Sequence, residues 1–179
     1  MMPALGAAMR LFLFFTLLTG GAYPLLMTGF GQSLFPIQAN GSLIEQDGKR
    51  VGSALIAQKF EKDIHFWPRP SAVDYNPLPS GGSNLGPTSQ DLKTKIEERK
   101  KLNLTEDLRF ASASGLDPHI SLRSALAQAP RVAAALQVPI RELNQLIHNK
   151  LEGRQFGFLG EPRINVLMLN LALDERMKR

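Results

Sequence analysis

Three histidines are the residues best suited to acid–base or metal chemistry, because the sequence contains no cysteine. His65 lies two positions after Asp63 and His119 lies two positions after Asp117, so each ring could pair with a carboxylate. No two histidines have the spacing of a metal site, and the sequence contains neither Gly-x-Ser-x-Gly nor His-Glu-x-x-His. We therefore predict no catalytic residue and no metal site, and the default interpretation is histidines in loops and on the surface.

A glycine-rich segment is the part of the chain best suited to contact phosphate. Consecutive glycines can aim backbone N–H groups at an anion, and hydroxyl groups stand on both sides of them here. The candidate nucleotide-binding residues are Ser80, Gly81, Gly82, Ser83 and Asn84. No lysine follows them, so the segment is not a Walker P-loop. The alternative is a tight turn inside a proline-rich loop.

The elements that must position these residues begin with an uncharged stretch from Leu11 to Ile44. About twenty residues at ~1.5 Å rise span the ~30 Å hydrocarbon core, so its apolar first part is long enough to cross a membrane. We predict a cytoplasmic N-terminus at 1–10, a transmembrane helix at 11–31, an extended connector at 32–44 and an outer domain at 45–179. The alternative is a secretory signal cleaved after Ala22.

One face of the predicted span carries small or polar residues at every fourth position. They are Thr16, Gly20, Pro24, Thr28 and Gln32. Small residues let helices approach each other closely in lipid, so we predict that this stripe docks on a partner helix. Pro24 is expected to kink the helix unless a neighbour satisfies the carbonyl group that it frees. Arg10, beside the span, favours a cytoplasmic N-terminus.

The residues after the span have the composition of one globular domain. The whole chain of 179 residues is 44% hydrophobic and 21% charged, and its net charge of +5 is spread thinly, which favours a generic basic surface. The pattern predicts an α+β fold with a long Pro/Gly-rich loop. The expected elements are strands at 51–57, 108–113 and 164–169, a loop at 68–87, and helices that begin after Ser89 and Ser121 and at Pro130 and Pro139.

Residues 125–147 have the rhythm of a helix-turn-helix, which makes a membrane-anchored DNA-binding regulator an alternative. In that interpretation Arg141, Asn144 and Gln145 would face base edges. A helical hairpin that packs its alanines into the core would explain the same pattern. The two interpretations differ in topology, because a domain outside the membrane cannot meet DNA.

Several long and irregular motifs together resemble one family. They are Gly52-Ser53-Ala54-Leu55-Ile56, Arg69-Pro70-Ser71-Ala72, Ser80-Gly81-Gly82-Ser83-Asn84-Leu85-Gly86-Pro87, Ser112-Ala113-Ser114-Gly115-Leu116-Asp117-Pro118-His119, Glu161-Pro162-Arg163-Ile164-Asn165-Val166 and Leu169-Asn170-Leu171-Ala172-Leu173-Asp174. With them the sequence resembles the C subunit of the Kdp potassium-transporting ATPase over nearly its whole length.

The resemblance implies a single-pass protein of the bacterial inner membrane whose main domain is periplasmic. Its partners would be a channel-like potassium-binding subunit, a P-type ATPase subunit and a small stabilising subunit. ATP and K⁺ would be handled by those partners, and the chain itself would need no cofactor and no nucleic acid. The resemblance further implies an accessory role in assembly at the outer membrane face.

A second role attached to the family is that of a catalytic chaperone that raises the ATP affinity of the pump subunit. It leans on similarity to a Leu-Ser-Gly-Gly-Gln signature, from which this chain departs at Pro79 and Ser83. For the accessory role, we expect the rigid proline-rich loop to dock on a partner through Arg69, Tyr75 and Asn84.

Overall fold

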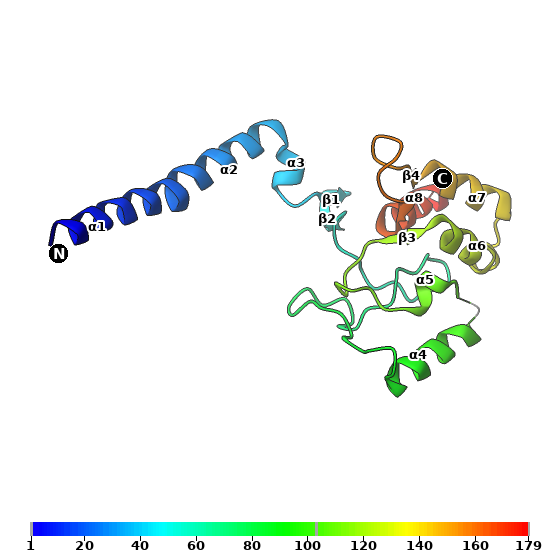
Figure 1. The fold of residues 1–179 in the computed structure, drawn as a ribbon. Coiled ribbons are helices and arrows are strands. Elements are labelled where there is room, and N and C mark those ends of the chain that lie inside the picture. Colours follow the sequence, from blue (N-terminus) through cyan, green and yellow to red (C-terminus); the bar gives the residue numbers. More distant parts are fainter. Residues whose placement is uncertain (1, 103, 179) are drawn as a thin grey trace. The chain divides into compact units, whose positions relative to one another are not determined.

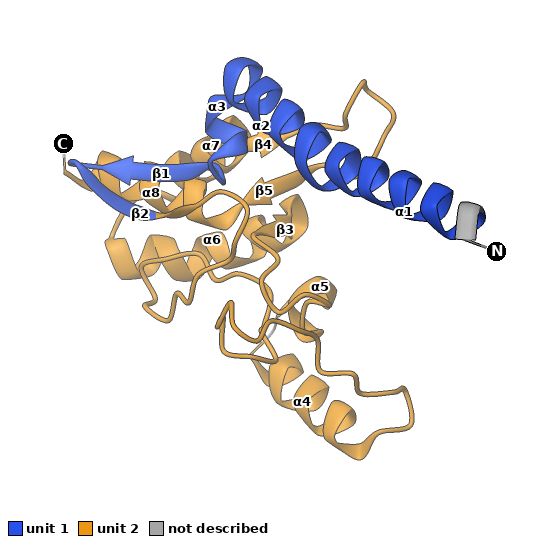
Figure 2. Ribbon diagram, turned by 90° about the vertical axis from the view of Figure 1, so that its left-hand side faces the viewer, with its two compact units in different colours: residues 1–51 blue, residues 52–179 orange. Residues whose placement is uncertain are grey.

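The computed structural model describes residues 2–102 and 104–178, which fall into two compact units, Met1–Val51 and Gly52–Arg179 (Figure 2). Unit 1 begins with α1 (Met2–Leu17), η1 (Leu18–Ala22) and α2 (Tyr23–Leu34), which follow one another as a single long helix (Figure 1). Residues Ala4–Leu34 of it are long and apolar enough to cross a membrane, and none of the most apolar window is buried.

The π-helical segment η1 ends at Ala22, two residues before Pro24. The backbone N–H of Tyr23 donates to the carbonyl of Leu18, five residues earlier. Pro24 has no N–H, so a regular α-helix would leave the carbonyl of Gly20 without its donor. A π turn is a common way for a helix to absorb such an interruption.

Residues 32–44 were expected to form an extended connector, and this is wrong for most of their length. The helix continues to Leu34, α3 (Pro36–Ala39) follows, and β1 (Leu43–Gln46) pairs with β2 (Lys49–Ser53). The physical reason lies in the side chains, because the amides of Gln32 and Asn40 bond to each other at 3.0 and 3.2 Å. Asn40 also donates to the carbonyl of Pro36 at 2.7 Å, which closes the short helix.

Unit 2 combines helices with a small antiparallel sheet, which confirms the α+β class. Its elements are α4 (Gln90–Lys101), α5 (Glu106–Arg109), β3 (His119–Ser121), α6 (Leu122–Leu136), α7 (Ile140–Asn149), β4 (Leu151–Glu152), β5 (Arg163–Asn165) and α8 (Val166–Met177). The strand order is β3-β5-β4, with Ile164 in register with both Ile120 and Leu151. Helix α7 packs on α6 and α8, these two helices pack on the sheet, and the core is buried there (Figure 1).

Within the described chain, residues 54–89 form neither helix nor strand. Phe66 is nevertheless fully buried, and Asn170 accepts from its N–H at 2.8 Å and donates to its carbonyl at 2.9 Å. Gln128 does the same for the backbone of Trp67, at 2.8 and 3.1 Å. Two buried amides thus replace the partner strand that this segment lacks, and they fix it to α8 and α6.

The helices expected after Ser89 and Ser121 are confirmed as α4 and α6, and both serines accept a hydrogen bond from the first turn. The helix expected to begin at Pro139 is confirmed as α7, of which Pro139 is the N-cap residue. Pro130 begins no helix, because α6 continues through it with its buried face toward the core.

Of the three predicted strands, the first and the last are present but shorter than expected, and the middle one is wrong. In the range 108–113, Leu108 and Arg109 belong to α5 and residues 110–113 form neither helix nor strand. Asp107, also in α5, accepts from the backbone N–H of Ser121 at 3.1 Å. The strand expected at 164–169 ends at Asn165, whose side chain caps α8 by accepting from Met168 N. The first predicted strand, 51–57, overlaps β2 but ends at Ser53.

Candidate functional site

The irregular segment brings two predicted docking residues together. Tyr75 Oη donates to the carbonyl of Arg69 at 2.9 Å, and burial raises the pKa of Tyr75 to about 12. Arg69 Nη1 donates to Asp117 at 3.1 Å and Nη2 donates to the carbonyl of Ala111 at 3.4 Å. Arg69 therefore holds the irregular segment against residues 111–117, and Tyr75 closes a turn within that segment. The third predicted docking residue, Asn84, is exposed.

Asp117 also belongs to a row of ionisable side chains that runs from Arg69 to Arg163. Its other carboxylate oxygen accepts from His119 N at 3.0 Å, and the His119 ring lies 3.7 Å from Asp117 and 3.8 Å from Glu152. Glu152 in turn pairs with Arg163 at 3.0 Å. Burial opposes ionisation of Asp117, but bonds from His119 and Arg69 together hold its pKa below the usual range.

The pairing possible between Asp63 and His65 is not made. His65 Nε2 lies 3.2 Å from Asp174 on α8, and its ring packs edge-on against Phe60. Asp63 instead lies 3.6 Å from Arg131. Among the residues that the structure describes, no group of three or more His, Asp or Glu side chains could hold a metal ion.

The glycine-rich segment packs its backbone closely against residues 112–115. A Cβ atom on Gly82 would lie 2.8 Å from the carbonyl oxygen of Ala113. A Cβ atom on Gly115, which has φ +72°, would lie 2.6 Å from the carbonyl oxygen of Gly81. Gly82 and Gly115 thus have a packing role that accounts for the missing side chains. Nucleotide binding by residues 80–84 stays a prediction.

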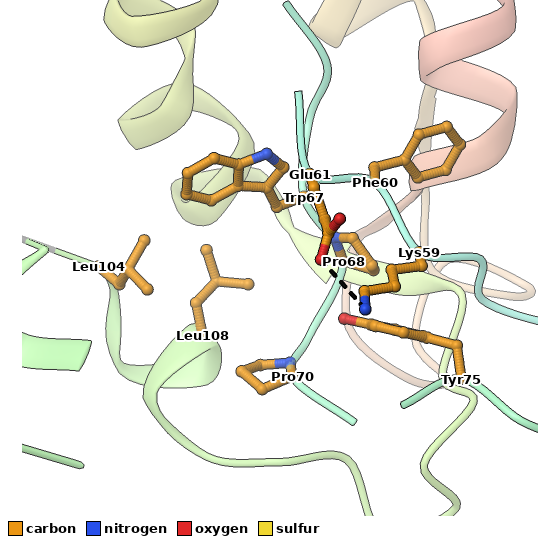
Figure 3. Close-up of a pocket in the computed structure, with 9 residues that line it drawn as sticks. All are labelled: Lys59, Phe60, Glu61, Trp67, Pro68, Pro70, Tyr75, Leu104 and Leu108. Carbon is orange, nitrogen blue, oxygen red and sulfur yellow. Dashed lines mark ion pairs between the residues drawn. The ribbon is translucent and has the colours of Figure 1, made fainter. Parts of the chain in front are cut away.

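The irregular segment also forms most of the wall of a hollow of about 360 Å³ (Figure 3). Nine residues line it: Lys59, Phe60, Glu61, Trp67, Pro68, Pro70, Tyr75, Leu104 and Leu108. In Figure 3, Trp67, Leu104 and Leu108 lie across the hollow from Lys59 and Tyr75. Lys59 pairs with Glu61 at 3.1 Å and with Asp74 at 2.9 Å, so the ammonium group in this wall is already neutralised.

Trp67 also carries the guanidinium of Arg131 on its ring, at 3.6 Å from the ring centre. Arg131 donates to the carbonyls of Asp63 and His65 at 2.8 and 2.9 Å. Sequence reasoning did not single out this pair, because its members lie 64 positions apart. The one available signal was that Trp67 is the single tryptophan of the chain.

The comparisons with known proteins identify the family. The family described as K⁺-transporting ATPase, c chain, matches residues 5–175. The chain belongs to this family. It is 48% identical to the potassium-transporting ATPase KdpC subunit of Geotalea uraniireducens, over 97% of this chain and 98% of that protein. The subunits of Geobacter sulfurreducens and Photorhabdus laumondii are each 51% identical, over 98% and 95% of this chain and 100% and 95% of theirs.

Membership confirms the resemblance drawn from the sequence and makes the chain the c-type subunit of a potassium-transporting ATPase. It lends no support to the DNA-binding alternative. In the structure, the apolar neighbours of the proposed base-reading positions, Leu143, Leu146 and Ile147, are buried core residues of α7. Helices α6 and α7 therefore form a hairpin that packs into the core.

The stripe on the N-terminal helix is exposed at all five positions: Thr16, Gly20, Pro24, Thr28 and Gln32. Thr28 donates its hydroxyl hydrogen to the carbonyl of Pro24 at 2.8 Å, and a Cβ atom on Gly20 would meet nothing within 4 Å. The hydroxyl group of Thr28 is thus hydrogen-bonded within its own helix. The small side chains of the stripe leave room for another helix to approach closely.

Proposed function

We propose that the chain is an accessory, non-catalytic subunit of a high-affinity, ATP-driven potassium uptake complex. It stabilises the assembly of a channel-like potassium-binding subunit with a P-type ATPase subunit at the outer membrane face, beside a small stabilising subunit. Those partners handle ATP and K⁺. Support comes from the relatives, each of which is named a subunit of a potassium-transporting ATPase.

The observation that carries the proposal is the exposed N-terminal helix. Phe12, Leu17 and Leu25 are 65%, 71% and 75% exposed, and the most apolar window of Ala4–Leu34 has no buried residue. A continuous apolar surface of this size is not stable in water. Lipid covers it on most sides, and the stripe of small residues is the side on which a partner helix fits.

The π segment sharpens that stripe. Residues spaced by four drift around an α-helix, so Thr16 and Gln32 would be separated by roughly 160° at 3.6 residues per turn. A π turn takes up one residue more than an α turn, and it therefore rotates the following residues back by roughly 100°. The five stripe residues then fall within an arc of roughly 80°, which is narrow enough for one partner helix.

For the topology, we propose that the N-terminus is cytoplasmic, in the bacterial inner membrane, and that residues 45–179 lie on the periplasmic side. Arg10 next to the apolar stretch supports this orientation. In this position the outer domain caps the potassium entrance of the channel-like subunit. Asn84 is exposed for contact, whereas Arg69 and Tyr75 keep the irregular segment in shape.

The catalytic-chaperone role belongs to the same proposal. ATP is cytoplasmic and residues 80–84 are placed outside, so we propose that an effect on ATP affinity passes through contacts between subunits. Labelling of the full chain, within the complex, by a photoreactive ATP analogue tests this point. Label on residues 80–84 would contradict the indirect route.

The decisive experiment separates docking from simple anchoring. Replacing Thr16, Gly20 and Thr28 together by leucine keeps the helix apolar, but it puts bulky side chains where the stripe has small ones. We expect this variant to reach the membrane and to lose the complex, measured as the amounts of the other subunits that co-purify after mild detergent extraction.

The matched control replaces Phe14, Phe15 and Phe30 by leucine. These phenylalanines lie on the opposite side of the helix once the π segment is counted, and they are 58%, 53% and 56% exposed. We expect the control to assemble like the natural chain. Equal co-purification from the stripe variant and the control would refute docking through the stripe.

A further inference from the structure

The segment between β4 and β5 exposes a cluster of large apolar side chains. This segment, residues 153–162, is here called the phenylalanine loop, and it projects from the strands as the orange-brown loop in Figure 1. Phe156 is 88% exposed, Phe158 70% and Leu159 47%. Phe156 is the most exposed of the large hydrophobic side chains that the structure describes.

The loop is held in one shape by its own bonds. Gln155 and Leu159 exchange two backbone hydrogen bonds, both of 2.9 Å, and Gly157 N donates to the carbonyl of Arg154 at 3.1 Å. Arg154 Nη2 also bonds both carboxylate oxygens of Glu161, at 2.9 and 3.0 Å, which closes the base of the loop. The two phenylalanines are therefore presented by a preorganised turn.

This shape is unfavourable for the free chain on two counts. The exposed rings order water without gaining contacts. Phe156 also adopts the left-handed backbone conformation, with φ +53°, which is strained for a bulky residue. Backbone strain of this kind is concentrated at functional sites.

We propose that the phenylalanine loop is a docking knob that inserts Phe156 and Phe158 into an apolar, uncharged pocket on another protein subunit of the ATPase. This inference rests on the proposed function, which supplies the partner subunits. Exposed aromatic anchors dominate the binding energy of protein interfaces, and a loop that is rigid before binding loses little entropy on docking.

The charge of the loop favours a protein pocket over a lipid surface. Interfacial membrane anchors combine their apolar face with basic residues that attract anionic lipid. In the loop the single basic residue, Arg154, is paired with Glu161, so the local charge is neutral. Arg163 at the start of β5 is paired in the same way with Glu152. An uncharged protein pocket complements this surface best.

The first test places a photoreactive benzoyl-phenylalanine at position 156 of the full chain in its native membrane. Irradiation is expected to join the chain to another subunit of the potassium-transporting ATPase, identified by the mass of its peptides. Adducts with lipid alone, with a second copy of the chain, or with nothing would overturn the proposal.

The second test compares Phe156→Ser with Phe158→Ser in the complex, and uses Leu102→Ser as the matched control. Leu102 is 64% exposed and belongs to the same unit, but it lies at the end of α4. Each phenylalanine variant is expected to reduce co-purified partner subunits by roughly tenfold or more, as for an interface hot spot, while the control changes little.

Unchanged co-purification from both phenylalanine variants would overturn the knob and leave the proposed function intact. Absence of the partners from the natural chain itself would overturn the proposed function as well. The fluorescence of Trp67 on denaturation reports whether each variant is folded, so a folding defect is distinguished from a lost contact.

Discussion

The guanidinium of Arg131 on α6 stacks on the ring of Trp67, 3.6 Å from the ring centre. It also donates to the backbone carbonyls of Asp63 and His65, at 2.8 and 2.9 Å. One side chain thus binds a ring and a backbone at the same time. Burial lowers the pKa of Arg131, with Asp63 opposing this effect, and the group stays charged in the neutral range. The contact holds the Trp67 ring in place, and this ring forms one wall of the hollow in Figure 3.

Arg131→Lys should therefore destabilise unit 2 although it conserves the charge. A lysine cannot stack as a plane or donate to Asp63 and His65 from one fork, so we expect the free energy of unfolding to fall by about 1–2 kcal/mol. Urea denaturation of the full chain in detergent, followed by Trp67 fluorescence, measures this. The exposed Arg123→Lys serves as control and should stay within about 0.5 kcal/mol of the natural chain; equal losses would contradict the role of Arg131.

Gly82→Ala and Gly81→Ala form a matched pair on adjacent residues. A Cβ atom at Gly82 would lie 2.8 Å from the Ala113 carbonyl, whereas a Cβ atom at Gly81 would meet nothing within 4 Å. We expect the first change to lower the free energy of unfolding by about 1–3 kcal/mol and the second to change it little. The same denaturation measurement checks both, and equal stability of the two variants would show that close packing does not explain Gly82.

Asp117→Asn should change the pH dependence of stability. The pKa of Asp117 is lower in the folded chain than its ordinary value of 3.8. Its charge therefore stabilises the fold above the unfolded pKa, and this contribution is lost as pH falls through the folded pKa. We expect the variant to be less stable than the natural chain at pH 7, and the difference in the free energy of unfolding to shrink between about pH 5 and pH 2. A difference that is constant or grows on acidification would contradict the pairing.

Pro24→Ala should alter the register of the stripe. Alanine restores an N–H that can donate to the carbonyl of Gly20, so we expect the π segment to become α-helical and the two halves to rotate by roughly 100° relative to each other. The chain has no cysteine, so single Thr16→Cys and Thr28→Cys substitutions allow crosslinking without background. Both positions should capture the same partner in the natural helix and only one of them in the Pro24→Ala helix. Capture from both positions in the Pro24→Ala helix would contradict the role of the π segment.

The features that the sequence predicted well are those that depend on near neighbours. Ser89 and Ser121 cap the helices that follow them, and each bonds a residue three positions away. The apolar run up to Leu34 needed no tertiary contact to be recognised. The family was recognisable because its motifs are long and are read directly from the chain.

The features that were missed depend on residues far apart in the sequence. Phe66 is hydrogen-bonded by Asn170, 104 positions later, so no local pattern showed that this irregular segment is part of the core. Asp107 likewise bonds Ser121 across 14 positions, in the short helix α5 that takes the first two positions of the strand expected at 108–113. The close packing of Gly82 on Ala113, and of Gly115 on Gly81, likewise joins residues more than 30 positions apart and is not visible from spacing.

The central claim is that this chain holds a potassium-transporting ATPase together as an accessory subunit. The most direct measurement is the native mass and subunit composition of the particle recovered with the full, tagged chain after mild detergent extraction of its own membrane. The account predicts one particle that contains the chain together with a channel-like subunit and a P-type ATPase subunit. Recovery of the chain alone, or only with copies of itself, would contradict it.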